Sequence, residues 1–201
     1  MGNFPDIPFF PAPPAPLVEV VPLGRVNQTA AAVVAANLQA IFGLDAGITD
    51  PWLEPDYALV SARGQYDAGP ILEALAGNGP GLPLRVGLTR LDLCLPFLSY
   101  VFGEAQMEGR AAVVSTHRLG EGRRGGRASR SLVLERLAKV ALHEMAHVLG
   151  LVHCRAPRCL MNFSPGLAAL DRLGAFLCPA CQALLDMRRR RLLAGRGRAP
   201  R

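Results

Sequence analysis

Hydrophobic and polar positions alternate along the first two thirds of the chain in the lengths typical of short strands and helices. Residues 27–44 and 69–77 have helical character, and in the first segment Asn27 or Thr29 is a candidate N-cap and Gly43 a stop. Runs rich in Val and Leu predict strands at residues 17–24, 57–62, 82–89 and 111–119. Because strands and helices alternate, the pattern predicts an α/β layer with a largely parallel sheet.

Two segments between these elements are harder to assign. Residues 91–103 contain Pro96, and proline belongs at an edge or a bend because it has no backbone N–H. Residues 120–130 are rich in glycine and arginine, which indicates a solvated loop.

A longer helix is predicted from Ser131, as its N-cap, to about Leu149. His143 and His147 lie one above the other on one side of this helix. Gly150 is expected to end it, because glycine readily adopts the left-handed conformation that turns the chain. The neighbouring face is apolar at steps of three and four residues, and consists of Leu134, Leu137, Ala138, Ala141, Met145 and Val148.

The composition fits one domain with short appendages. The chain has 201 residues, and half of them are hydrophobic, which is enough for a core. Residues 1–16 are rich in proline and predict an extended arm, which leaves residues 17–187 as the domain. The formal charge of +6 belongs to residues 188–201, because this segment has seven arginines and the rest of the chain has 15 basic and 16 acidic residues. We expect a disordered, solvated tail, and contact with nucleic acid is the less favoured alternative.

Membrane contact is not expected. No apolar run approaches the roughly 18 residues needed to span a bilayer. Prolines interrupt the apolar N-terminal stretch, which also lacks the basic start of a secretory signal. We therefore expect a cytoplasmic protein, and we expect a monomer.

Three of the four histidines lie in the segment HEMAHVLGLVHC, residues 143–154. His143 and His147 are four residues apart on a helix, which places their imidazoles about 5–6 Å apart on one side, where they can bind one metal ion. After the turn at Gly150, His153 can become a third ligand. Three neutral nitrogens and one open position are typical of a catalytic zinc site. Glu144, next to the first ligand, is the expected general base for a zinc-bound water.

The cysteines predict a second metal site. Cys154 and Cys159 form a C-x4-C pair, and Cys178 and Cys181 form a C-x2-C pair. Four thiolates in two short-spaced pairs suit a tetrahedral structural zinc. The alternatives are redox activity of the second pair, or four buried free thiols. Cys94 has no partner in sequence and is interpreted as a core cysteine.

The pattern HExxHxxGxxHC, followed by CLMNFS and CPAC, resembles the archaemetzincins, a branch of the metzincin zinc peptidases. The resemblance runs from about residue 17 to about residue 187. It implies a metzincin-like α/β (α+β) fold, with a twisted mixed sheet, an active-site helix and a small zinc-pinned C-terminal part. It also implies that Met161 is the methionine turn beneath the catalytic metal.

The expected function is therefore zinc-dependent hydrolysis of peptide bonds in a peptide or protein substrate, with one catalytic and one structural Zn²⁺ per chain. Two alternatives remain open. The enzyme could act as an aminopeptidase rather than an endopeptidase, or the chain could be a zinc-stabilised binding module with a basic tail.

Two finer expectations concern the substrate. The strand at residues 111–119 is expected to form the edge of the cleft, where a peptide could add as an antiparallel strand. Some metzincins carry a tyrosine after the methionine turn, but here all three tyrosines precede Met161. His117 and Tyr66 are candidates for stabilising the oxyanion, although a structural role is the favoured interpretation of each.

Overall fold

The computed structural model describes residues 15–196 except 80, 82, 123 and 124. Most of the expected Pro-rich arm, residues 1–14, lies outside the described residues, as do residues 197–201. Within the described part, none of the helices combines the length and apolar character that a membrane crossing needs.

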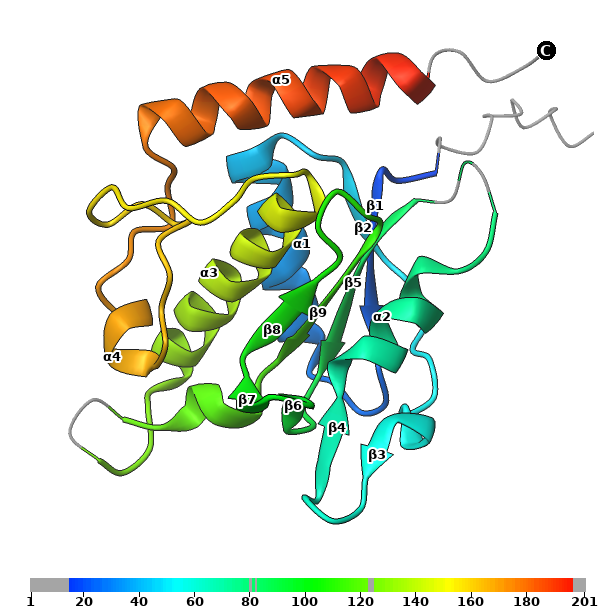
Figure 1. Cartoon of the computed structure of the whole chain (residues 1–201), viewed down its shortest axis with the longest axis vertical. Coiled ribbons are helices and arrows are strands. Elements are labelled where there is room, and N and C mark those ends of the chain that lie inside the picture. The colour runs from blue at the N-terminus through cyan, green and yellow to red at the C-terminus, as the bar shows by residue number, and fades with distance from the viewer. Residues whose placement is uncertain (1–14, 80, 82, 123–124, 197–201) are drawn as a thin grey trace, which may run out of the picture.

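The main sheet has five strands in the order β2-β1-β5-β9-β8 (Figure 1). Their bounds are β1 Val18–Pro22, β2 Ala46–Ile48, β5 Leu84–Thr89, β8 Gly103–Ala105 and β9 Ala111–Ser115. The first four strands in this order are parallel, which confirms the expected sheet type, whereas β8 is antiparallel to β9. The prediction that residues 111–119 form an edge is wrong, because β9 pairs on one side with β5 and on the other with β8. The edge strand is β8.

Helices cover both faces of this sheet. On one face lie α1 (Gln28–Phe42) and α3 (Arg130–Val148), and on the other lies α2 (Ala68–Ala76). Each face has its own buried cluster, since side chains of β9 alternate between the two: Ala112 and Val114 point one way, and Ala111 and Val113 the other.

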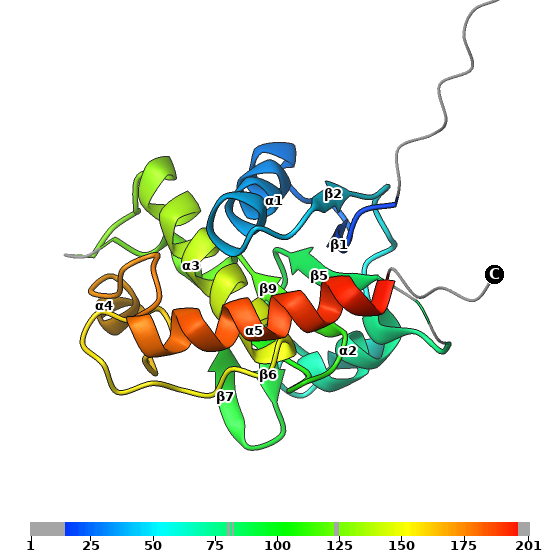
Figure 2. The ribbon, with the colours of Figure 1, turned by 90° about the horizontal axis from the view of Figure 1, so that it is seen from above.

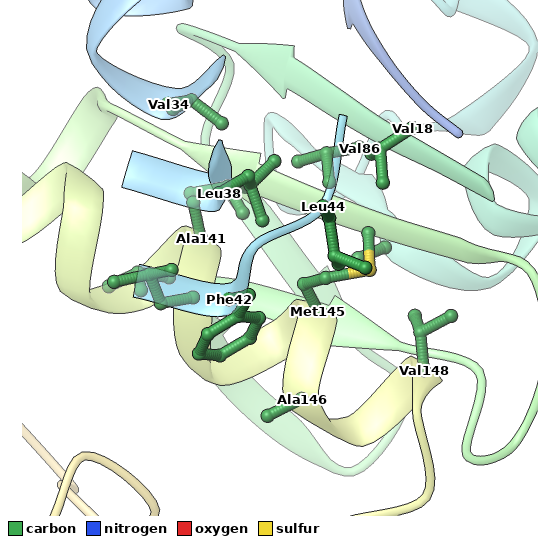
Figure 3. Close-up of a cluster of buried hydrophobic side chains, with 14 of the residues drawn as sticks. Val18, Val34, Leu38, Phe42, Leu44, Val86, Ala141, Met145, Ala146 and Val148 are labelled. Carbon is green, nitrogen blue, oxygen red and sulfur yellow. The ribbon is translucent and has the colours of Figure 1, made fainter. Parts of the chain in front are cut away.

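The larger cluster holds α3 in place. Figure 3 shows Leu38 and Phe42 of α1 beside Ala141 and Met145 of α3, and Val86 of β5 belongs to the same cluster. All five residues are buried to 99% or more. The apolar face of α3 therefore faces the sheet and α1. The side of α3 that carries the histidines lies outside this contact.

A second, smaller sheet lies beside the first. It consists of β3 (Leu59–Val60), β4 (Gln65–Asp67), β6 (Leu93–Leu95) and β7 (Leu98–Val101), in that order. The predicted strand at residues 57–62 reduces to β3, which follows the 3-10 helix η1 (Asp56–Ala58). Pro96 lies in the turn of the β6–β7 hairpin, so the expected bend is confirmed. Both β2 and β4 were missed, because three residues are too few to show a pattern.

The ends of two helices follow the sequence signals closely. The Asn27 side chain caps α1 by accepting from the Thr29 N–H at 2.8 Å, and Gly43 ends it with φ 60°. For α3 the N-cap is Ser129 rather than Ser131, since the Ser129 hydroxyl accepts from the Leu132 N–H at 3.2 Å. Gly150, with φ 86°, makes the expected turn after α3.

The C-terminal part contains α4 (Leu167–Leu170) and α5 (Pro179–Arg196), and a short 3-10 helix η2 (His117–Gly120) precedes α3. Seen from above, α5 crosses the molecule from the side of α4 to the side of α2 (Figure 2). The expectation of a disordered tail is wrong for residues 188–196, which form the second half of α5. Leu185 is buried in the larger cluster and Leu192 packs against it, so this helix is anchored to the body.

Candidate active site and metal centres

The histidine site is built by α3 and the loop that follows it. His143 and His147 are one turn apart on the helix, and the turn at Gly150 brings His153 back to them. The Nε2 atoms of His143 and His147 are 3.1 Å apart, and those of His143 and His153 are 3.3 Å apart. Nitrogens that bind one tetrahedral zinc at about 2.0–2.1 Å lie about 3.3 Å from each other. The three histidines predicted from the sequence therefore fit a single zinc ion.

Hydrogen bonds from the opposite ring nitrogen orient two of the imidazoles. His143 Nδ1 lies 2.8 Å from the Leu160 carbonyl, and His147 Nδ1 lies 2.7 Å from the Leu151 carbonyl. A carbonyl only accepts, so each Nδ1 donates and each Nε2 presents a lone pair. Lone pairs converging at this distance repel one another unless a cation lies between them. This donor set therefore fits a metal, and the two carbonyls fix the orientation of the His143 and His147 rings.

The protonation of the histidines also suits a metal. Burial lowers the pKa of His143 to about 4 and lowers the pKa of both His147 and His153. All three rings are therefore neutral near pH 7, which is the form that binds a metal.

Glu144 lies between α3 and the edge strand. Burial, with a smaller effect of the nearby Glu104 carboxylate, raises the pKa of Glu144 to about 8. Without a metal this carboxyl group would be protonated at pH 7. A divalent cation at the histidines would favour the carboxylate, because an opposite charge nearby lowers a carboxyl pKa.

The three histidines line a cleft of about 860 Å³. One wall consists of residues 98–105, which include β7 and β8, and the other includes Leu160 and residues 163–165. Tyr100 joins the two walls, since its hydroxyl donates to the Pro165 carbonyl at 3.4 Å. A cleft of this size, which the three histidines line, can accept an extended peptide.

The cysteine site joins the loop after α3 to the start of α5. The Sγ atoms of Cys154, Cys159, Cys178 and Cys181 all lie within 4.8 Å of one another. Those of Cys154 and Cys178 are 3.8 Å apart, which is about the separation expected of two thiolates bound to one tetrahedral zinc at about 2.3 Å. Hydrogen bonds, first that from the Cys181 N–H, lower the pKa of Cys178 to about 7. Cys94 lies elsewhere as a buried free thiol, as expected.

The histidine group and the cysteine group are directly connected. Cys154 follows His153 in the chain, and the Cys154 N–H donates to the Met161 carbonyl at 2.7 Å. Met161 is fully buried, and the preceding residue, Leu160, accepts the hydrogen bond from His143. The turn at residues 160–161 therefore lies against both groups.

The two candidates for oxyanion stabilisation do not lie in the cleft. His117 faces a neighbouring hollow, and its Nδ1 is 3.3 Å from the Arg90 carbonyl. Tyr66 packs against the smaller core cluster. The cleft residues that sequence reasoning missed include Tyr100 and Glu104, because only the fold reveals that the segment around β7 and β8 faces the histidines.

Comparisons with known proteins agree with this geometry. The model of peptidase family M54 matches residues 82–187. An archaemetzincin from Natronomonas pharaonis is 34% identical over 168 residues, which are 82% of this chain and 96% of the relative. The chain belongs to peptidase family M54, the archaemetzincins.

Two archaemetzincin crystal structures have the same fold. The protein from Archaeoglobus fulgidus, complexed with malonate, is 32% identical with a TM-score of 0.73, and the match covers 83% of this chain and 98% of that one. The protein from Methanopyrus kandleri is 30% identical with a TM-score of 0.74, and the match covers 89% and 99%. As an archaemetzincin, the chain is a zinc metallopeptidase that acts on peptide or protein substrates, and it is not merely a binding module.

Proposed function

We propose that His143, His147 and His153 hold the catalytic zinc and that Glu144 is the general base. The observation that carries this assignment is the convergence of three Nε2 atoms inside a cleft that Glu144 also lines. When bound there, zinc would activate a water molecule and polarise the carbonyl of the scissile bond.

In this proposal Glu144 moves the protons. Its carboxylate accepts a proton from the attacking water and passes it to the leaving amine, so that the amine departs neutral. The apolar surroundings that raise the pKa of Glu144 strengthen it as a base when the metal holds it ionised. The Leu160 and Leu151 carbonyls keep the His143 and His147 rings fixed throughout.

The substrate lies along β8 rather than along β9. The Phe102 carbonyl accepts from the Ser115 N–H, and the Gln106 N–H donates to the Ala111 carbonyl, so these residues pair with β9. In an antiparallel ladder the main-chain groups alternate, and those of Gly103 and Ala105 therefore point toward the open edge. An extended peptide would pair there as an additional antiparallel strand.

The four cysteines hold a second, structural zinc, which makes two ions per chain. Support comes from the closeness of the four sulfur atoms and from two N–H···S hydrogen bonds at 3.3 Å, from Ala156 to Cys154 and from Cys178 to Cys159. This zinc fixes the loop that carries His153, and so supports the catalytic ligand set.

Aminopeptidase action is a second candidate, because the cleft contains the carboxylate that such a mode needs. Glu104 lines the cleft and is close enough to Glu144 to raise its pKa. A carboxylate on the edge strand could bind the free amino group of a substrate. If so, Glu104→Gln should lower kcat/KM for peptides with a free N-terminus by about tenfold or more, and should change kcat/KM for N-acetylated peptides much less.

The variant Glu144→Gln tests the proposed base. Turnover of peptides should fall by at least about a thousandfold, because the amide cannot accept the proton, while two zinc ions remain bound. Metal content and peptide hydrolysis are measured on the same preparation. Normal turnover in this variant would mean that another group is the base.

A further inference from the structure

Lys139 is the only lysine of the chain and the only Lys or Arg among the described residues that line the cleft. It lies on α3 one turn before His143. Its side chain is only 4% exposed, although lysine is rarely buried. The residues that line the cleft with it include the apolar Val140, Leu160, Leu170 and Leu173. A cation in apolar surroundings attracts a group of opposite charge.

The ammonium group has more donors than strong acceptors among the described residues that it contacts. Lys139 Nζ donates to the Glu135 carboxylate at 2.6 Å, and it reaches the Leu170 carbonyl only at 3.5 Å. An ammonium has three donors, so one strong hydrogen bond does not satisfy it. Glu135 is 51% exposed, and water therefore weakens its hold on the charge.

The direction of the edge strand shows which part of a substrate meets Lys139. A Cβ at Gly103 would lie against Glu144 and Val140, and the Glu108 N–H donates to the His147 carbonyl. The chain from β8 therefore runs in the same direction as α3, and Lys139 lies toward the start of β8. A peptide antiparallel to β8 places its C-terminal part at that end. Lys139 thus meets the side of the leaving amine.

We propose that Lys139 selects substrates with an acidic side chain, Asp or Glu, at the residue that follows the scissile bond. The apolar walls accept the methylene groups, and the ammonium at the end forms a charge-assisted hydrogen bond with the carboxylate. The inference rests on the proposed function and on a peptide bound along β8.

The test compares matched peptides. Cleavage sites are first mapped by mass spectrometry in a mixture of C-terminally amidated peptides. The best substrate is then synthesised with Glu or Gln after the scissile bond, and kcat/KM is measured for both. We expect Glu to be preferred about tenfold or more, because a hydrogen bond between two charged groups in a partly desolvated site discriminates to that extent. Equal rates for the two peptides would overturn the inference.

The variant Lys139→Met keeps the length of the side chain and removes its charge. It should abolish the preference for Glu while the Gln peptide is still hydrolysed. Arg172→Met is the matched control, since Arg172 is exposed and lines the neighbouring hollow instead of the cleft. A preference that survives in Lys139→Met, or that disappears in Arg172→Met, would overturn the assignment. If Lys139→Met does not fold, the variant Glu135→Gln provides the test. It removes the carboxylate that binds the ammonium group, so the preference for the Glu peptide should increase. An unchanged preference would contradict the proposal.

A binding measurement separates this inference from the proposed function. The same two peptides are titrated, by fluorescence anisotropy, into zinc-loaded Glu144→Gln protein, where turnover is not needed. Tighter binding of the Glu peptide supports the inference even if a group other than Glu144 is the base. The Gln peptide is also titrated in two forms, one with a free C-terminal carboxylate and one with a C-terminal amide. A preference that requires the free C-terminus would overturn the side-chain assignment.

Discussion

The missing side chain of Gly103 lets the edge strand approach the proposed base. A Cβ at this position would lie 2.7 Å from Glu144 Cγ, 2.9 Å from the Val113 carbonyl oxygen and 3.0 Å from Val140 Cγ1. The variant Gly103→Ala should therefore displace either Glu144 or β8. We expect kcat/KM to fall by about tenfold to a hundredfold, because small displacements of a catalytic group are costly.

The matched control is Gly120→Ala, since a Cβ at Gly120 would meet no atom within 4 Å. Its kinetics should equal those of the wild type. Overpacking should also lower the free energy of unfolding of Gly103→Ala by about 1–3 kcal/mol, measured by denaturant titration. Unchanged activity and stability in Gly103→Ala would contradict the described closeness of β8 and Glu144.

A buried ion pair also fixes the wall of the cleft. Arg136 is 1% exposed and donates to the two carboxylate oxygens of Asp171 at 2.7 and 2.8 Å, which holds the end of α4 against α3. The variant Asp171→Leu would leave the guanidinium buried without this carboxylate. We expect the free energy of unfolding to fall by about 3–5 kcal/mol, measured by denaturant titration.

The control for this variant is Glu54→Leu. Glu54 pairs with the exposed Arg90 at 3.5 Å, and the loss of such a surface pair should cost less than about 1 kcal/mol. A similar small effect for Asp171→Leu would mean that the Leu119 and Glu121 carbonyls alone satisfy Arg136.

At the scale of the elements, the site depends on α3 and β8, and these two differ in how far the sequence reveals them. The 3- and 4-residue steps of apolar positions, together with Gly150, predict α3 and the placement of His143 and His147. By contrast, β8 has the sequence Gly-Glu-Ala, with no β-branched or aromatic residue, and gives no strand signal. Which strand forms an edge depends on the order of strands in the sheet, which local patterns do not encode.

The position of β8 leads to a prediction on substrate binding. When a zinc-binding peptide analogue occupies the cleft, amide hydrogen exchange at Gly103 should slow, because its main chain becomes paired. The amides of β9 are already paired on both sides and should not change. Protection of residues 111–115 without protection of residue 103 would favour the original expectation for that strand.

The helix α5 shows a different limit of sequence reasoning. The run of four arginines at residues 188–191 indicated a solvated tail, yet arginine and leucine are both good helix formers. Leu185 and Leu192 are seven residues apart, so they lie on one face and pack on the body. In the sequence, the run of arginines between these two leucines makes the apolar spacing hard to recognise.

At the scale of the whole molecule, the four cysteines connect α5 to the loop that carries His153. Cys178 and Cys181 lie at the start of α5, and Cys154 follows His153. The variant Cys181→Ser should lower Tm by about 5–10 °C, since a loss of a few kcal/mol shifts Tm by roughly 2–4 °C per kcal/mol in a chain of this size. It should also speed tryptic cleavage at residues 188–191, measured by mass spectrometry.

The control for this prediction is Cys94→Ser, which changes a cysteine outside the four-cysteine group. Its tryptic pattern should match the wild type. If Cys181→Ser has the same Tm and cleavage rate as the wild type, the four cysteines do not stabilise α5 through a metal.

The most direct measurement of the central claim is zinc content per chain. Elemental analysis is performed on protein purified without chelator, alongside His143→Ala and Glu144→Gln. The account predicts two zinc ions in the wild type and in Glu144→Gln, and one in His143→Ala, because only the histidine site loses a ligand. A single zinc in the wild type that survives the change at His143 would contradict the assignment of a catalytic zinc to these three histidines.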